Sequence, residues 1–129
     1  ISMGWHPETG FIEADWHVYN EGMIVLLLAM GSPTHPVGPE VWEEWCSVYG
    51  DSWTDEYGTP HLHFAPMFGH QYSHMFIDFR GIRDAWMREK SAEIGDFDYF
   101  QNSVRAVAAQ QYYARTNPMG WVGYDDQVW

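Results

Sequence analysis

Two clusters in the sequence contain residue types that can act chemically on a polar substrate. The first is the segment 19–22, in which Glu21 directly precedes an apolar run. A carboxyl group enclosed in a pocket has a raised pKa, as a general acid working near neutral pH requires. Glu21 is therefore a candidate proton donor if it lies in a pocket. At an exposed helix start it would only stabilise its own helix through the helix dipole.

The second cluster is rich in histidine. His70, Gln71 and His74 lie within residues 68–74, and Asp78 follows after a further interval of four. In a helix, His70, His74 and Asp78 would form one stripe. Such a stripe can line a cavity, where imidazole and amide groups bind hydroxyls, or it can bind zinc. The His-Glu-x-x-His motif of metalloproteases is missing, so we favour the cavity and expect no metal or other cofactor.

The composition excludes several classes of partner. The net charge is −12 with only six Lys and Arg, so a cationic surface for nucleic acid is excluded. The longest apolar run, residues 23–30, is shorter than the roughly 20 residues that cross a bilayer. The single cysteine, Cys46, excludes an internal disulfide and a four-cysteine zinc site. Abundant Trp and Tyr suit either a bulky core or the face of a sugar ring.

The first two elements expected to position these clusters are helices. Asn20 is a good N-cap for a helix over residues 21–30, which is apolar on all faces and so is predicted to be buried. Gly31 ends it. Pro39 suits the first position of a second helix, which continues to Tyr49.

Two further helices follow a predicted loop over residues 50–66. Apolar and aromatic residues at three- and four-residue steps predict a helix over residues 69–89. A fourth begins at Asp96 or Asp98 and ends at residues 116–118. Residues 1–19 are expected to form a long ordered loop with at most short extended pieces. No segment predicts a strand convincingly, so the expected fold class is all-α.

Several stretches also resemble one family. The resemblance is to the glycoamylase-like, or glucoamylase-like, family, which includes bacterial endo-β-1,2-glucanases and a domain of cyclic β-1,2-glucan synthases. It is carried by short blocks in family order over nearly the whole chain, at residues 3–5, 7–11, 19–22, 31–36, 68–74, 77–84, 98–103 and 117–121. The resemblance implies an (α/α)₆ barrel in a bacterial periplasmic, envelope or secreted protein. Since such a barrel needs about twelve helices, residues 1–129 are expected to be an internal portion of one such domain.

The resemblance also implies roles for particular residues. Glu21 corresponds to the family's acidic pocket residue and is the expected general acid, with the second carboxylate outside this chain. The expected contacts to an oligo- or polysaccharide substrate are Trp5, Tyr19, Asn20, His70, Gln71, His74 and Trp121. The expected function is hydrolysis of a bacterial glucan, with β-1,2-glucan as the best single candidate. The alternative is a non-hydrolytic carbohydrate-binding or scaffold domain of a cyclic glucan synthase.

Overall fold

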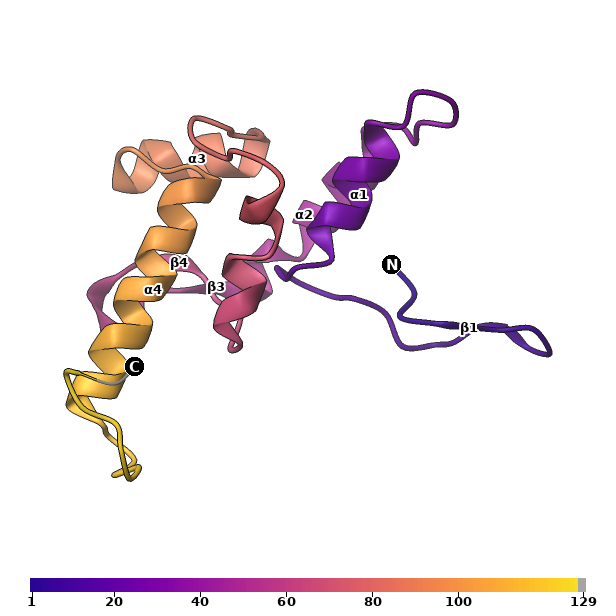
Figure 1. Cartoon of the computed structure of the whole chain (residues 1–129). Helices are drawn as coiled ribbons and strands as arrows, with labels where there is room; N and C mark the ends of the chain where they lie inside the picture. The colour runs from indigo at the N-terminus through magenta and orange to yellow at the C-terminus, as the bar shows by residue number, and fades with distance from the viewer. Residues whose placement is uncertain (128–129) are drawn as a thin grey trace.

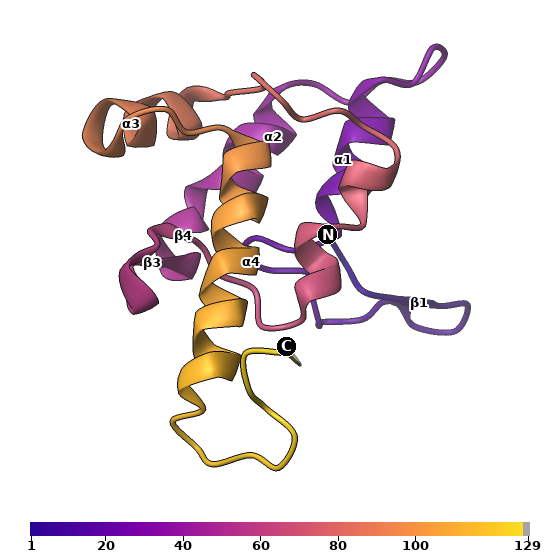
Figure 2. The same cartoon turned by 60° about the vertical axis from the view of Figure 1, so that its left-hand side comes forward.

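The computed structural model describes residues 1–127 and is mostly helical. Its four α-helices are α1 (Met23–Met30), α2 (Glu40–Ser47), α3 (Ala85–Ile94) and α4 (Tyr99–Thr116). The long helix α4 runs beside the other elements, while α3 crosses near its N-terminal end (Figures 1 and 2). None of the helices in residues 1–127 is both long and apolar enough to span a bilayer.

Two small antiparallel sheets correct the expectation of a purely helical fold. In the first, β1 (Trp5–His6) pairs with β2 (Gly10–Phe11). This hairpin projects away from the helices in both views (Figures 1 and 2), and it matches the short extended pieces expected there. In the second, β3 (Trp53–Thr54) pairs with β4 (His61–Leu62), with Thr54 opposite His61. The second sheet lies inside the segment predicted to be a loop.

The prediction for the fourth helix is confirmed at both ends. The Asp98 side chain accepts a hydrogen bond from the Gln101 amide at 2.7 Å, so Asp98 is the N-cap of α4. Its other oxygen accepts from the Gly81 amide at 2.8 Å, which ties the preceding loop to the helix start. At the C-terminus Asn117 is left-handed (φ 41°, ψ 57°), the conformation that ends many helices.

The predicted start of the first helix is wrong by two residues. Gly22 occupies the N-cap position of α1, and the Asn20 side chain accepts from the Gly22 amide in the turn that precedes the helix. The helix is also less buried than its apolar sequence predicts. Met23 and Ile24 are buried, but Val25 and Leu28 are 51% and 67% exposed. One apolar face of α1 is therefore uncovered by residues 1–127.

The second helix begins one residue later than predicted and is shorter at its end. Pro39 takes the N-cap position, where its missing amide hydrogen costs nothing, and α2 ends at Ser47. Tyr49 belongs to the following 3₁₀ turn η1 (Tyr49–Ser52). Trp45 and Tyr49 are both buried, as expected of the apolar face of this segment.

The predicted helix over residues 69–89 is wrong. The chain instead forms two 3₁₀ turns, η3 (Met67–His70) and η4 (Ser73–Met75), then a non-helical stretch, then α3. Gly81 has φ +76°, which interrupts any helix there. Asp84 caps α3 by accepting from the Met87 amide at 2.8 Å, so a helix begins at a point that the prediction placed inside one. The aromatic residues of this segment are spaced as in a helix, although most of the segment is not helical.

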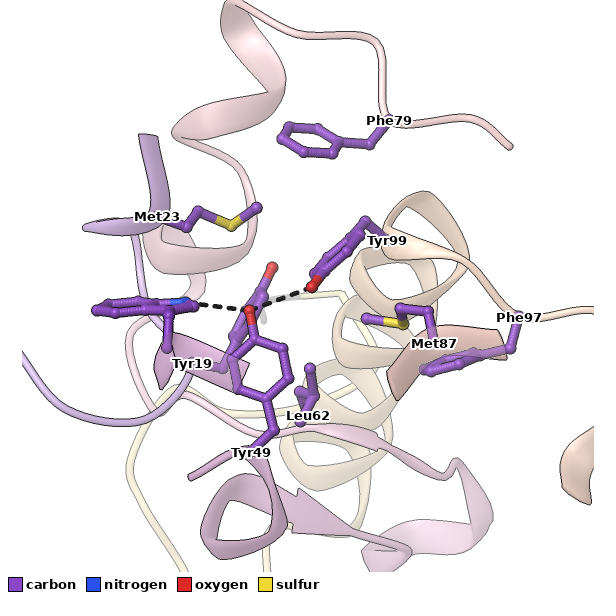
Figure 3. Close-up of a cluster of buried hydrophobic side chains, with 9 residues drawn as sticks. Tyr19, Met23, Tyr49, Leu62, Phe79, Met87, Phe97 and Tyr99 are labelled. Carbon is purple, nitrogen blue, oxygen red and sulfur yellow. Dashed lines mark hydrogen bonds between the residues drawn. The ribbon is translucent and has the colours of Figure 1, made fainter. Parts of the chain in front are cut away.

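The core lies where α4, α2 and the loops between them meet. Its largest enclosed side chains are aromatic, and Figure 3 shows the hydroxyls of Tyr49 and Tyr99 pointing toward each other inside it. These hydroxyls lie 3.2 Å apart, and Trp45 Nε1 donates to the Tyr49 hydroxyl at 3.1 Å. The buried core residues are Tyr19, Met23, Trp45, Tyr49, Leu62, Phe79, Met87, Phe97 and Tyr99. Tyr19 brings the first candidate cluster directly into this core.

Candidate active site

The Glu21 carboxylate lies against the backbone of the histidine cluster. A β-carbon added to Gly69 would stand 3.3 Å from Glu21 Oε2, so the missing side chain of Gly69 leaves room for the carboxylate. Oε2 is enclosed, and it has no hydrogen-bond partner within residues 1–127. His70 follows Gly69 directly in η3. Two clusters that are 48 positions apart in the sequence therefore meet at one point.

A tight turn positions Glu21. The Asn20 amide donates to the carbonyls of His17 and Val18, each at 3.0 Å, and its oxygen accepts from Gly22 at 2.7 Å. Asn20 is buried and its side chain is occupied by the backbone, so it shapes the turn instead of facing a groove. Val18 has φ +58°, a rare conformation for a β-branched residue. Such strained positions concentrate at functional sites.

A groove of about 400 Å³ opens on the other side of the histidine cluster. We call it the His70 groove, and it runs between η3, η4 and the first half of α4. Glu21 is not among its lining residues; the carboxylate stands behind Gly69. The groove is lined by His70, Gln71, His74, Met75, Phe100, Ser103, Val104 and Val107. The structure thus brings three of the predicted substrate contacts into one groove.

Ser103 holds the two histidines of this groove together. Its hydroxyl donates to the His70 carbonyl at 2.8 Å and lies 2.9 Å from His74 Nε2. Since the single hydroxyl proton is directed to the carbonyl, His74 Nε2 must carry the hydrogen of the second bond. This leaves His74 Nδ1 as an acceptor. No sequence pattern pointed to Ser103, because it lies on the buried face of a different element.

Burial keeps the histidines neutral. Desolvation lowers the pKa of His70 to about 3, and the neighbouring His61 adds to the effect. Desolvation also lowers the pKa of His74, against the raising effect of Asp78 and Asp98. A neutral imidazole has one donor and one acceptor nitrogen. One donor and one acceptor suit hydroxyl groups, whereas an anion would need a positive charge that a neutral imidazole lacks.

Tyr19 forms the inner wall of the site. Its ring lies 5.1 Å from the His70 ring and is fully buried. Desolvation raises the pKa of Tyr19 to about 12, although the side chains of Ser103 and Asn102 beside its hydroxyl oppose the rise. Tyr19 therefore stays protonated at physiological pH. Because Tyr19 is fully buried against the His70 ring, it supports His70 and does not reach an open surface.

Several enclosed polar atoms around this point lack partners. A buried polar atom without a hydrogen bond costs about 1–3 kcal/mol, so each such atom is a candidate partner for water or a ligand. Within residues 1–127 the unsatisfied side-chain atoms of this region are Tyr19 Oη, Glu21 Oε2, His70 Nδ1, Ser73 Oγ and Asn102 Nδ2. Four of these five residues are at most 1% exposed.

The two predicted stacking tryptophans lie away from the His70 groove. Trp5 belongs to the projecting β1–β2 hairpin and is 59% exposed. Trp121 lies beyond the C-terminal end of α4, where its Nε1 donates to the Tyr113 hydroxyl at 3.1 Å. Neither residue lines the groove. The structure therefore does not bring Trp5 and Trp121 together with Glu21 or His70.

The zinc alternative fails on geometry. It required His70, His74 and Asp78 on one helical face, but that helix does not form. Asp78 is exposed and forms an ion pair with Arg80 at 2.8 Å, while His74 Nε2 is bound to Ser103. In residues 1–127 no group of three or more His, Cys, Asp or Glu side chains is arranged to hold a metal ion.

A second polar centre escaped sequence reasoning altogether. Asp84 Oδ2 accepts from Trp42 Nε1 at 2.8 Å, from the Tyr99 hydroxyl, and from Cys46 Sγ at 3.4 Å. The carboxylate thus joins α2, α3 and α4. Burial, with a smaller effect from Asp84, raises the pKa of the Cys46 thiol, so this cysteine is no nucleophile. Only the capping signal of Asp84 was available in the sequence.

A larger groove lies elsewhere, and it shares no lining residue with the His70 groove. Its volume is about 670 Å³, and it is formed by residues 15–17, α1 and α2. Trp16 and Trp45 give it aromatic walls, and carboxylates from Asp15 and Glu40 stand at its edge. The sequence offered no signal for it, because its walls come from segments with no common motif.

Comparison with known proteins identifies the family of the chain. No curated protein and no solved structure matches the chain. The family model described as "Putative glucoamylase" matches residues 13–129, which includes Glu21, the His70 groove and all four helices. The family description points to a glycosidase-like domain. By this match over most of its length, the chain belongs to the glucoamylase-like family.

Proposed function

We propose that this chain is part of a glycoside hydrolase that cleaves a bacterial glucan, with β-1,2-glucan as its substrate. Glu21 is the general acid that protonates the leaving oxygen. The observation that supports this role most directly is the enclosed, unpartnered Oε2 of Glu21 against Gly69, next to His70. Among residues 1–127, no other carboxylate oxygen is both enclosed and without a partner.

The His70 groove, which Glu21 does not line, suits a neutral polyhydroxyl substrate. His70 and His74 are neutral because burial lowers the pKa of each. His74 Nδ1 is left as an acceptor because its Nε2 is bound to Ser103, and His70 Nδ1 has no partner, so both nitrogens are available to sugar hydroxyls. Gln71 adds an exposed amide at the groove rim. The His70 groove would hold the sugar by these groups and by its apolar walls.

Hydrolysis of a glycosidic bond requires a second carboxyl group. In an inverting enzyme it activates water at about 6.5–9.5 Å from the acid, and in a retaining enzyme it attacks at about 5–5.5 Å. The other carboxylates near this region have other tasks: Asp84 joins three helices and Asp98 caps α4. We therefore assign the second carboxylate to the remainder of the domain.

The remaining parts of the proposal follow from the family. The domain would be an (α/α)₆ barrel of a bacterial periplasmic, envelope or secreted protein, and this chain would be an internal portion of it. The uncovered face of α1, with Val25 and Leu28 exposed, is consistent with a further helix packing there. Trp5 and Trp121 would then contact the substrate only if the remainder of the barrel forms part of the cleft beside them.

One observation favours a second candidate function. Residues 1–127 contain one enclosed, unpartnered carboxylate oxygen where hydrolysis needs two carboxyl groups. The groove with its neutral histidines would bind sugar without any catalysis. The domain would then be a carbohydrate-binding or scaffold part of a cyclic glucan synthase.

Product analysis separates the two functions. The full-length protein would be incubated with linear β-1,2-glucan, and the chain lengths would be followed by chromatography. A hydrolase gives shorter oligosaccharides with time. An unchanged glucan that nevertheless co-sediments with the protein supports the binding function. An unchanged and unbound glucan contradicts both, and parallel incubations with β-1,3- and β-1,4-glucans test the linkage.

A further inference from the structure

We propose that a second, smaller pocket between η2 (Glu56–Gly58) and α4 binds a single sugar ring. We call it the Tyr57 pocket. Its volume is about 160 Å³, below the range of roughly 300–1,000 Å³ typical of drug-sized ligands, so it has room for one ring and not for a chain. The lining residues that matter here are Glu56, Tyr57, His61, His63, His70 and Gln110. Identifying the ligand as a sugar rests on the proposed function.

The charge of the pocket lining disfavours an anionic ligand. Its lining contains no Lys or Arg and one carboxylate, that of Glu56. Desolvation lowers the pKa of both His61 and His70, so neither imidazole supplies a positive charge near neutral pH. A phosphate would find no counter-charge. A ligand with hydroxyl groups finds imidazole nitrogens, an amide and a carboxylate as partners.

The lining of the pocket includes a residue with a buried, unpartnered nitrogen. His70 is 1% exposed, and its Nδ1 has no hydrogen-bond partner within residues 1–127. His61 Nδ1 lies 2.6 Å from the Thr59 carbonyl, which can only accept, so that nitrogen carries the hydrogen. His61 Nε2 is then the acceptor. One lining histidine is thus fixed in orientation, and another has an unmet hydrogen bond.

An aromatic wall completes the pocket. Tyr57 packs against Tyr113 at 6.0 Å and against Tyr112 at 5.6 Å between ring centroids, and it remains 40% exposed. Its backbone is left-handed (φ 62°, ψ 19°), a conformation that a bulky side chain rarely adopts. Trp121 fixes Tyr113 by donating to its hydroxyl. Flat rings with polar edges are suitable stacking surfaces for a sugar.

The pocket is attached firmly to α4. The Leu62 amide of β4 donates to Asn102 Oδ1 at 2.7 Å, and Arg105 Nη1 donates to the Pro60 carbonyl at 3.2 Å. These bonds hold the β3–β4 segment on the helix, so the pocket needs no large rearrangement to form. His70 lines this pocket as well as the His70 groove. The Tyr57 pocket is therefore an accessory subsite beside the proposed cleavage site.

The test is a titration of the full-length protein carrying Glu21→Gln and histidines labelled with ¹⁵N. The probes are D-glucose, the β-1,2-linked disaccharide sophorose, and inorganic phosphate. We expect the imidazole signals of His61 and His63 to shift saturably with both sugars and not with phosphate. Tyr57→Gly removes the ring while keeping the left-handed backbone, and should weaken sugar binding by about tenfold or more. His63→Ala should weaken it as well.

Tyr72→Ala is the matched control, because Tyr72 is also a half-exposed tyrosine and does not line the pocket. Its dissociation constant should stay within about twofold of the parent. Absence of any shift at His61 and His63, an equal shift in Tyr57→Gly, or a response to phosphate in place of sugar would overturn the proposal. The titration uses the Glu21→Gln variant and so does not depend on catalysis. If sugar binds in the Tyr57 pocket but the wild type does not cleave glucan, only the proposed hydrolase function is refuted. Cleavage without these shifts refutes only the pocket.

Discussion

Glu21 Oε2 stands 3.3 Å from the position that a β-carbon on Gly69 would occupy, so the glycine and the carboxylate share one small space. The same β-carbon would lie 2.1 Å from the ring of Phe64. Since atoms cannot approach that closely, a side chain at position 69 must displace the Phe64 ring, and it also crowds the Glu21 carboxylate. Gly69 is therefore needed to keep Glu21 beside His70.

We expect Gly69→Ala to lower both stability and activity. Overpacking of this kind costs about 1–3 kcal/mol in the free energy of unfolding, and the displaced carboxylate should reduce glucan turnover. Thermal unfolding and product formation of the full-length protein measure the two effects. Gly50→Ala is the control, because nothing lies within 4 Å of a β-carbon there. Equal behaviour of the two variants would show that Gly69 has no special role.

Asp84 is expected to be among the residues most important for folding. Asp84→Ala removes the acceptor for Trp42 and Tyr99 and the N-cap of α3 together. Unsatisfied buried donors cost about 1–3 kcal/mol, and a lost cap costs about 1 kcal/mol. Urea denaturation should therefore show a large drop in the unfolding midpoint. Asp78→Ala, whose exposed partner is Arg80, should change it little; a similar drop there would contradict this account.

The buried histidines should make stability depend on pH. The pKa of His70 is about 3 in the folded protein and ordinarily near 6.5, so the unfolded chain binds more protons between these values. Stability is therefore complete above pH 6.5 and falls as the pH decreases toward 3. The slope contributed by this one residue is at most about 1.4 kcal/mol per pH unit.

Chemical denaturation at pH 5.0–6.5 measures this dependence before most carboxylates titrate. His70→Asn should flatten the slope, whereas His35→Asn, at an exposed position, should leave it unchanged. If replacement of His70 prevents folding, the imidazole signal of the parent protein answers the same question. That signal should remain in its neutral form down to pH 5. Protonation of His70 near pH 6.5 would refute the claim of deep burial.

The uncovered face of α1 should cause association of the isolated chain. Val25 and Leu28 are 51% and 67% exposed, and an apolar face of this kind is normally covered by another element. We expect the 129-residue chain to elute above its monomer mass in size-exclusion chromatography. Val25→Lys with Leu28→Lys should shift it toward the monomer. A monodisperse, cooperatively melting wild-type monomer would argue against a missing helix at this face.

The parts of the fold that could be predicted are those specified by residues that act on their neighbours in the sequence. Asp98 and residues 116–118 delimited α4 correctly, because a capping carboxylate and an Asn before proline act on their immediate neighbours. Pro39 marked the start of α2 for the same reason. Asn20 carried a true local signal as well, but its oxygen accepts within a turn that precedes the helix.

The parts that could not be predicted depend on contacts between distant segments. The aromatic spacing of residues 69–89 resembled a helical period, but Phe79 is buried by α4 and the preceding aromatics remain exposed. The pairing of His61 with Thr54 has no signature in two-residue strands. The approach of Glu21 to Gly69 was expected only from the family resemblance, since no local pattern specifies a contact over 48 positions.

The account depends most on Glu21 as the proton donor, and the turnover of Glu21→Gln tests it directly. The variant of the full-length protein is compared with the wild type and with Glu89→Gln, an exposed carboxylate of α3, on β-1,2-glucan. Loss of a general acid should reduce kcat by about 10²–10⁴-fold, with the melting temperature nearly unchanged. Turnover by Glu21→Gln equal to that of Glu89→Gln would remove Glu21 from the mechanism.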